Sequence, residues 1–292
     1  MTNAKTLTAA LGGKWHRRYG VAPCPVCQPE RRKDQDALTL SDGPDRLFAH
    51  CKKSGCTFRD ILVAAGMTPG TCQPPDPLVL ARRRADEQAK SQKKAALAQR
   101  LWAEAVPIRG TLAETYLRGR CISCVLPETL RFLPDCWHPT AKRFPALVAL
   151  VEGGEGFAVH RTYLRADGFG KAAVGPAKAM LGAVRGGAVR LNAGAGPLVV
   201  SEGIETALSL ASGLLNGPAT IWAALSTSGM DSLRLPALAG RLTTATDGDE
   251  PGRKAGEALA VRATAVGWRV SLLPAPLGRD WNDLLAMKGG AA

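Results

Sequence analysis

The sequence predicts an α/β protein in which a parallel sheet in the C-terminal third follows a cysteine-rich segment and a mixed α+β lobe. Three observations lead to this prediction. Strand-like apolar segments alternate with helical periodicity from residue 198 onward. Two close cysteine pairs lie within residues 1–67. The 292 residues are 46% hydrophobic and 22% charged, which is ordinary for a globular chain long enough to bury a core.

The positive charge of the chain is unevenly distributed. The whole sequence holds 38 Lys and Arg against 25 Asp and Glu, a formal net charge of +13. Residues 1–197 hold 30 basic and 16 acidic residues, whereas residues 198–292 hold 8 and 9. Such an excess indicates an anionic partner, with nucleic acid the first candidate and an anionic membrane surface the second.

Neither a membrane span nor a secretory signal is predicted. The longest apolar run, Phe144–Val151, is far shorter than the roughly 20 residues that a spanning helix requires. The segment Met1–Leu11 lacks the apolar core of a signal peptide. We therefore expect a cytoplasmic location and no membrane partner.

Four cysteines form two pairs at metal-ligand spacing. Cys24-Pro-Val-Cys27 is separated by 23 residues from Cys51-Lys-Lys-Ser-Gly-Cys56. Residues 37–40 and 46–49 between the pairs alternate as in a hairpin. Two such pairs can bring four thiolates onto one tetrahedral Zn²⁺, and a disulfide is disfavoured in the cytosol. We predict a zinc ribbon over residues 1–67 with these cysteines as ligands.

The middle of the chain divides into a linker, a helix and a lobe. Residues 68–78 are rich in Pro and Gly and predict a linker. Residues 79–105 predict a basic, polar helix, so that linker and helix together occupy residues 68–106. Short apolar runs with many glycines follow, and we assign residues 107–197 to an α+β lobe.

Residues 198–292 alternate between strand and helix. The expected strands are Leu198–Ser201, Thr220–Ala224, Leu242–Thr246 and Trp268–Leu273. Ile204, Leu208, Ala211 and Leu215 recur at helical spacing. A second helix is expected over Gly252–Val266, with Gly267 in the position that favours a left-handed backbone. This alternation indicates βαβ units and a parallel sheet.

Acidic residues follow two of these strands. Glu202 follows the first strand, and Asp247 and Asp249 follow the third. The carboxyl ends of parallel strands are where binding sites form in such sheets. Clustered carboxylates repel one another unless a cation such as Mg²⁺ or Mn²⁺ is bound. Alternatively, Asp247 to Gly252 serves only as the start of a helix, which leaves Glu202 unexplained.

These motifs resemble those of a known domain family. Val199-Val200-Ser201-Glu202-Gly203 and Asp247-Gly248-Asp249-Glu250-Pro251-Gly252 are similar to the two signature motifs of the Toprim domain. That domain occurs in bacterial primases, topoisomerases, OLD-type nucleases and RecR recombination mediators. A four-cysteine ribbon before it resembles primases of phages and plasmids, although the second cysteine loop is longer here. The resemblance to Toprim primase-like proteins of plasmids and prophages extends over most of residues 15–285. The further segments that carry it are Gly110-Thr111, Glu114–Leu117, His160–Leu164, Gly203–Ser209 and Asp280–Leu284.

The resemblance implies a DNA primase. Such an enzyme makes short RNA primers on a single-stranded DNA template from nucleoside triphosphates, by Mg²⁺-dependent nucleotidyl transfer, and cooperates with a separate replicative helicase. It implies that Glu202, Asp247 and Asp249 are catalytic and hold Mg²⁺. It also implies that Arg161, Lys171 and Lys178 bind the nucleotide. Asp280 and Asp283 are either additional metal ligands or the N-cap of a helix.

Two other functions remain open at this stage. A RecR-like mediator would use the zinc ribbon and the Toprim domain only to bind DNA, and it would not need the full acidic set. A Toprim nuclease would keep the same acids. A topoisomerase is disfavoured because the chain is too short for the strand-passage domains.

Overall fold

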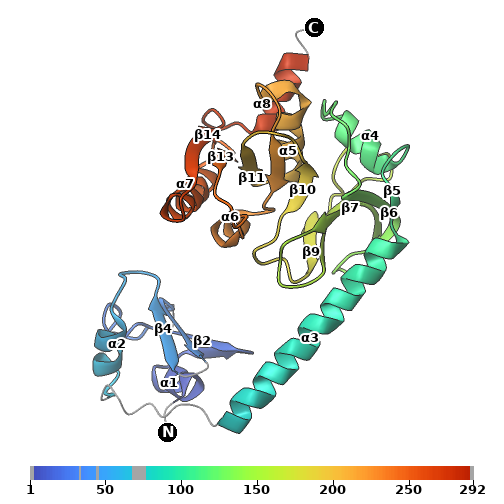
Figure 1. The fold of residues 1–292 in the computed structure, drawn as a ribbon. Helices are drawn as coiled ribbons and strands as arrows, with labels where there is room; N and C mark the ends of the chain where they lie inside the picture. Colours follow the sequence, from blue (N-terminus) through green and yellow to red (C-terminus); the bar gives the residue numbers. More distant parts are fainter. Residues whose placement is uncertain (1–2, 33, 44–45, 68–76, 290–292) are drawn as a thin grey trace. The chain divides into compact units, whose positions relative to one another are not determined.

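The computed structural model describes residues 3–32, 34–43, 46–67 and 77–289. The chain forms two compact units, Met1–Gln88 and Ala89–Ala292 (Figure 1). Most of the linker predicted over residues 68–78 lies outside the described residues. No helix among the described residues is long and apolar enough to cross a membrane.

The first unit is built on an antiparallel sheet with the strand order β1-β2-β3-β4. Its elements are α1 (Ala4–Ala10), β1 (Lys14–His16), β2 (Tyr19–Ala22), β3 (Leu38–Asp42), β4 (Leu47–Cys51) and α2 (Phe58–Ala64). The predicted hairpin is confirmed, because β3 pairs with β4 and places Leu38 opposite Cys51. A small core that includes Leu7, Leu40 and Ile61 joins the sheet to both helices.

Both short helices of this unit begin at a side-chain cap. The Asn3 carboxamide accepts a hydrogen bond from the backbone N–H of Thr6, and the Thr57 hydroxyl accepts one from Asp60. Capping satisfies backbone groups that the first turn of a helix leaves free. These caps determine where α1 and α2 start.

A long helix, α3 (Pro77–Glu104), agrees with the predicted polar helix. Near its end, Ala98 is fully buried against β7 and β8, and Leu101 and Trp102 pack beside it. The guanidinium of Arg131 lies over the Trp102 ring at 4.3 Å from its centroid. The C-terminal turns of α3 therefore cover one face of the lobe that follows.

The lobe is an antiparallel sheet with the order β5-β6-β7-β8-β9. Its elements are β5 (Val106–Pro107), α4 (Leu112–Arg118), β6 (Leu130–Trp137), β7 (Arg143–Val151), β8 (Ala158–Tyr163) and β9 (Lys178–Gly182). Side chains alternate between the two faces along each strand. On β7, Val148 packs in the cluster with α3, whereas Leu147 and Ala149 pack in the main core.

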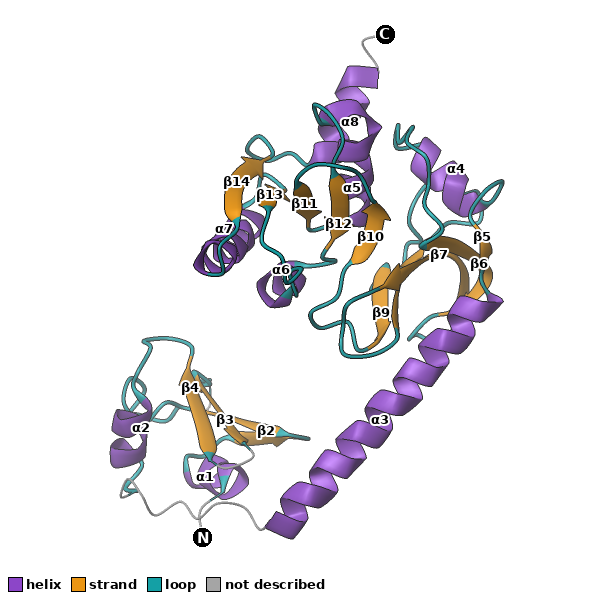
Figure 2. Cartoon of the chain, in the orientation of Figure 1, coloured by secondary structure: helices purple, strands orange, loops and turns teal. Residues whose placement is uncertain are grey.

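The C-terminal sheet has the order β10-β12-β11-β13-β14 (Figure 2). Its elements are β10 (Val189–Asn192), β11 (Leu198–Ser201), α5 (Ile204–Ser209), the π-helical turn η1 (Leu210–Leu214), β12 (Thr220–Ala223), α6 (Thr227–Ser232), β13 (Arg241–Thr246), α7 (Glu250–Ala265), β14 (Arg269–Pro274) and α8 (Trp281–Gly289). Strands β12, β11, β13 and β14 run parallel, as predicted. Gly267 has φ +87°, as expected after a helix.

Helices cover both faces of this sheet. Val199, Ile221 and Ala245 face α5, whereas Val200 and Leu242 face α7. The two sets alternate along the strands, as the period of two requires.

Strand β10 was not predicted. It pairs antiparallel with β12 although it lies within residues 107–197, which we assigned to the preceding lobe. One hydrophobic core also runs from the lobe into the C-terminal sheet and includes Leu147, Leu208 and Ile221. The division into four segments remains a prediction, but the lobe and the C-terminal sheet share one core.

Leu208→Ala tests that shared core. Leu208 is fully buried on α5, so we expect the substitution to lower the free energy of unfolding by about 2–5 kcal/mol. Urea denaturation measures this change. Leu238→Ala is the control, because Leu238 is 88% exposed and its truncation should change stability by less than about 0.5 kcal/mol. Equal effects of the two substitutions would contradict the assignment.

Candidate zinc and acidic sites

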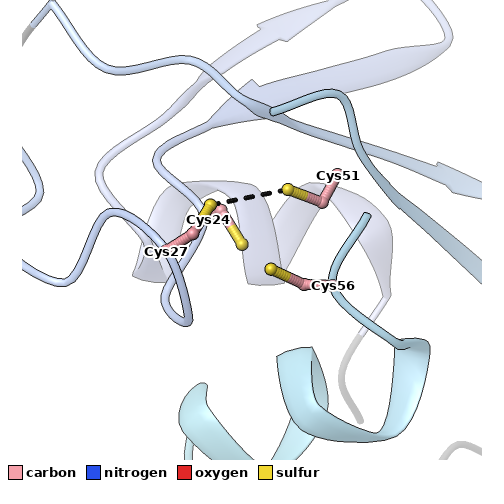
Figure 3. Close-up of side chains that lie close together, drawn as sticks. All are labelled: Cys24, Cys27, Cys51 and Cys56. Carbon is pink, nitrogen blue, oxygen red and sulfur yellow. Dashed lines mark hydrogen bonds between the residues drawn. The ribbon is translucent and has the colours of Figure 1, made fainter. Parts of the chain in front are cut away.

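The four predicted zinc ligands converge in the first unit (Figure 3). Cys24 and Cys27 lie in the loop after β2, Cys51 ends β4, and Cys56 precedes α2. Their sulfur atoms all lie within 4.8 Å of one another, and the sulfurs of Cys27 and Cys51 are 3.5 Å apart. Tetrahedral Zn–S bonds of about 2.3 Å place sulfurs about 3.8 Å apart, so the cluster fits one zinc ion.

The loop between the second pair of cysteines supports a thiolate. Burial opposes ionisation of Cys51, but backbone N–H groups of Ser54, Cys56 and Lys53 bond its sulfur, and the pKa of Cys51 falls to about 6. Burial and the neighbouring thiols raise the pKa of Cys56 to about 12. The longer second loop therefore supplies N–H donors to a cysteine ligand.

One residue that the sequence analysis missed holds the first cysteine loop in place. The carboxamide oxygen of Gln28 accepts hydrogen bonds from the backbone N–H groups of Cys24 and Ala37, at 3.2 and 3.1 Å. Gln28 is only 7% exposed. The sequence indicated this role only by a polar residue directly after Cys27. That Gln28 bonds the backbone N–H of Ala37 is determined by the fold.

The predicted acidic residues lie at the carboxyl ends of neighbouring strands. Glu202 follows β11 and Asp247 follows β13, and these two strands pair directly. Both side chains are half-buried. Burial raises the pKa of Glu202, and the charges of Asp247 and Asp249 raise it further. Burial likewise raises the pKa of Asp247, with contributions from Asp280 and Asp249.

The acids are close enough to interact but are less tightly gathered than the cysteines. Among the described residues, only the four cysteines form a group of three or more potential ligands within 4.8 Å of one another. One oxygen of Asp247 accepts a hydrogen bond from the Thr206 hydroxyl at 3.1 Å. The backbone N–H of Thr227 bonds the Glu202 carboxylate and partly offsets the rise in its pKa.

Asp249 has the structural role that the sequence left open. It is the N-cap of α7, where one carboxylate oxygen accepts the backbone N–H of Gly252 at 2.8 Å. The chain at Gly248 lies so close to Pro276 that only glycine fits, since a Cβ at this position would lie 1.9 Å from the Pro276 carbonyl oxygen. Asp249 remains exposed, so its other oxygen is open to solvent.

Asp280 and Asp283 form a reciprocal cap at the start of α8. The backbone N–H of Asp283 donates to Asp280 at 2.8 Å, and that of Asp280 donates to Asp283 at 3.1 Å. The indole of Trp281 donates to the Thr246 carbonyl oxygen at 3.1 Å, which places this cap beside the end of β13. The geometry shows the N-cap alternative, while the charge of Asp280 still acts on Asp247.

Two of the predicted nucleotide-binding residues share one carboxylate partner on α5. The ammonium groups of Lys171 and Lys178 lie 3.3 and 3.0 Å from the carboxylate of Glu205 on α5. Lys178 also lowers the pKa of both Glu202 and Asp247, although burial and like charges leave both raised. Each lysine side chain is about one third exposed and so remains available to an anion.

Glu205 was not among the predicted site residues. It is 5% exposed, and its Oε1, the oxygen that Lys171 contacts, also accepts a hydrogen bond from the Tyr116 hydroxyl at 2.8 Å. Burial opposes its ionisation, but the two lysines outweigh burial and hold the pKa of Glu205 far below its usual range. The sequence signal was an acid three residues after Glu202, which also fits the first turn of a helix.

Arg161 lies apart from this group. On β8 it shares a face with Val159 and Tyr163, on the side covered by α3, whereas Lys178 lies opposite Thr162 on the other face. Arg161 is 6% exposed and donates to the Trp137 carbonyl oxygen at 3.0 Å. Its role in nucleotide binding remains a prediction.

Comparison with known proteins identifies the C-terminal domain. Residues 197–291 match the model of the Toprim domain. The C-terminal part of the chain is therefore a Toprim domain, as its motifs predicted, and it carries the parallel sheet. Residues 92–191 match a domain of unknown function, DUF7146.

One solved structure that matches the chain is that of the Aquifex aeolicus primase, described as its zinc-binding and RNA polymerase domains. It is 14% identical, with a TM-score of 0.41, and the match covers 100% of this chain and 84% of that one. No curated protein matches the chain.

Removing one cysteine tests the zinc site. We expect the purified wild type to hold about one zinc ion per chain and Cys56→Ser to lose most of it, because a tetrahedral site needs all four ligands. Metal analysis after dialysis measures the ratio. Cys121→Ser is the control, since Cys121 is an exposed free thiol outside the cluster. Equal zinc contents in both variants would contradict the assignment.

The buried ion pairs of Glu205 predict a dependence of stability on pH. Since its folded pKa lies below the unfolded value of about 4.3, ionised Glu205 stabilises the fold above that pH, and this contribution is lost as pH falls toward the folded pKa. Glu205→Gln should lower the free energy of unfolding by about 1–3 kcal/mol at pH 7 and by less at about pH 3.

Urea denaturation at the two pH values measures this difference. Glu257→Gln on the exposed side of α7 is the control and should change stability little at either pH. A loss that is the same at both pH values would show that the charge of Glu205 is not what stabilises the fold.

Proposed function

We propose that this protein is a primase that synthesises short RNA primers on single-stranded DNA by metal-dependent nucleotidyl transfer. One observation carries the proposal: Glu202 and Asp247, at the ends of adjacent parallel strands of a Toprim domain, are half-buried acids with raised pKa values, and the charge of Lys178 acts on both. Carboxylates that lie close together despite their mutual repulsion, with a cation nearby, suit a site for a metal-bound triphosphate.

The acidic residues fit a divalent cation. Burial and mutual repulsion disfavour the ionised forms of Glu202 and Asp247, and a cation would offset both effects. Oxygen ligands of this kind suit Mg²⁺ or Mn²⁺. Glu202, Asp247 and the open oxygen of Asp249 would hold the ion, and Asp280 would add to the negative field. When bound, the ion supplies charge neutralisation for the transferring phosphoryl group.

The two lysines would bind the triphosphate. Glu205 is buried and bonds both ammonium groups, so it fixes the positions of the two lysines while part of each ammonium stays exposed to solvent. Fixed cations need no reorganisation as charge develops on the phosphoryl group. Glu202 is the proposed general base toward the 3′-hydroxyl of the growing primer.

The zinc unit would contact the template. Its exposed aromatic side chains include Phe48 and Phe58, which are 43% and 42% exposed. The Arg46 guanidinium lies over the Phe48 ring at 5.1 Å. Exposed aromatic and basic groups together bind single-stranded nucleic acid by stacking and phosphate contacts. A separate replicative helicase and a phage or plasmid origin rest on the motif resemblance alone.

A primer-synthesis assay tests the proposal. Single-stranded DNA, labelled ribonucleoside triphosphates and Mg²⁺ should yield short oligoribonucleotides with the wild type. Asp247→Ala should reduce the yield by about 100-fold or more, because it removes a charge that acts on the transferring group. Removal of Mg²⁺ should abolish synthesis. Glu257→Gln, which changes an exposed acid on α7 outside the site, should retain it.

The same assay separates the alternative functions. Cutting of the template that depends on Asp247 would indicate a Toprim nuclease. DNA binding without either reaction, unchanged by Asp247→Ala, would indicate a RecR-like mediator. Each of these results would contradict the primase proposal.

A further inference from the structure

A groove beside the acidic residues has no role in the site described above. Its volume is about 630 Å³, within the range of roughly 300–1,000 Å³ that small-molecule sites occupy. The lining residues come from β9, the segment after it, and the loop and helix after β12. They include Met180, Val184, Arg185, Leu225, Ser226 and Ser228.

The groove adjoins the acidic site, because the same segments carry residues of both. Lys178 and Met180 lie two residues apart on β9 and therefore on one face. Lys178 bonds Glu205, while Met180 lines the groove. After β12, the backbone N–H of Leu225 donates to the Glu202 carbonyl oxygen at 2.7 Å, and Leu225 itself lines the groove. A molecule in this groove would lie next to the segments that carry Lys178 and Glu202.

The chemistry of the lining suits a nucleoside. Met180, 38% exposed, together with Val184 and Leu225 offers apolar contact to a flat heterocycle. The hydroxyls of Ser226 and Ser228 bond each other at 3.0 Å, and that of Ser232 donates to the Ser228 carbonyl oxygen at 2.9 Å. Together they keep one free O–H and unused lone pairs for base edges and sugar hydroxyls. Among the described residues that line the groove, the charged one is a cation, Arg185, and none is a carboxylate.

The loop that forms one wall has a specific, strained backbone. Leu225 has φ +74°, a left-handed conformation that is unfavourable for a branched side chain. Gly229 approaches the chain so closely that a Cβ would lie 1.9 Å from the Ala224 carbonyl oxygen. Strained positions of this kind persist where the surrounding structure holds them, and they cluster at ligand sites.

We propose that this groove binds the nucleoside part of a single nucleoside triphosphate, with its phosphates directed to Lys178 and the acidic residues. The inference rests on the proposed nucleotidyl transfer and adds where the base and sugar lie. A groove of this size, with one cation, matches one nucleoside better than a polynucleotide strand, which needs a longer basic track.

Filling the groove tests this inference. In Met180→Trp and Ser228→Trp, a large side chain is added from two different elements at exposed positions, so neither fold nor metal site should be disturbed. Calorimetric titration with ATP, GTP, CTP or UTP in the presence of Mg²⁺ should show at least about tenfold weaker binding, equivalent to about 1.4 kcal/mol. Binding of inorganic tripolyphosphate, which has no nucleoside, should not change. Leu238→Trp, which does not line the groove, is the control.

Three outcomes would overturn the inference. In the first, both groove variants bind nucleotides as tightly as the wild type. In the second, nucleotide binding and tripolyphosphate binding weaken together. In the third, the groove variants bind a single-stranded oligonucleotide more weakly but bind nucleotides normally. The last result would assign the groove to DNA. Primer synthesis by the wild type, measured in parallel, separates the two proposals: synthesis with unaffected groove variants contradicts only this inference. Absence of both synthesis and nucleotide binding contradicts both.

Discussion

The buried carboxylate of Glu205 is the interaction on which the arrangement of the acidic site depends. It joins α5 of the Toprim domain to Lys171 and Lys178, which the lobe contributes, and to Tyr116 on α4. An ionised carboxylate at this depth would be strongly unfavourable alone. Three partners make it favourable, so the lobe is held where the charge of Lys178 acts on Glu202 and Asp247. The shared hydrophobic core brings the lobe and the Toprim domain together, while this polar contact fixes the position of the lobe on α5.

The acids of the site show the opposite balance. Glu205 is buried with more positive than negative charge around it, whereas Glu202 and Asp247 are half-buried among other carboxylates. The fold therefore gives up stability at these two residues, and a bound cation would restore it. A stabilised structural acid thus lies beside two destabilised acids. This difference distinguishes the residue that positions the site from those proposed to act in the chemistry.

Much of the Toprim domain could be predicted because its signals are local. The strand Leu198–Ser201 and the helix ending before Gly267 follow from apolar periodicity and a left-handed glycine. The cysteine pairs likewise predicted their own cluster. The edge strand β10 was missed although Val189–Asn192 alternates apolar and polar residues, because four residues are too few to identify a strand and its pairing with β12 is set by the fold. Arg161 shows the same limit, because a basic residue in a motif does not reveal which face of the sheet it occupies.

The sequence by itself determined which residues carry the chemistry: four cysteines at ligand spacing and acids at the ends of two strands. These features are set by covalent spacing and by the direction of parallel strands. Only the tertiary structure decided how the charges pair, since Glu205 and its lysines lie far apart in the chain and meet because the lobe packs on α5. It also decided that Asp280 and Asp283 cap a helix, and that a groove opens beside Glu202. Long-range contacts set burial, and burial determines whether a charge stabilises the fold or remains available to a ligand.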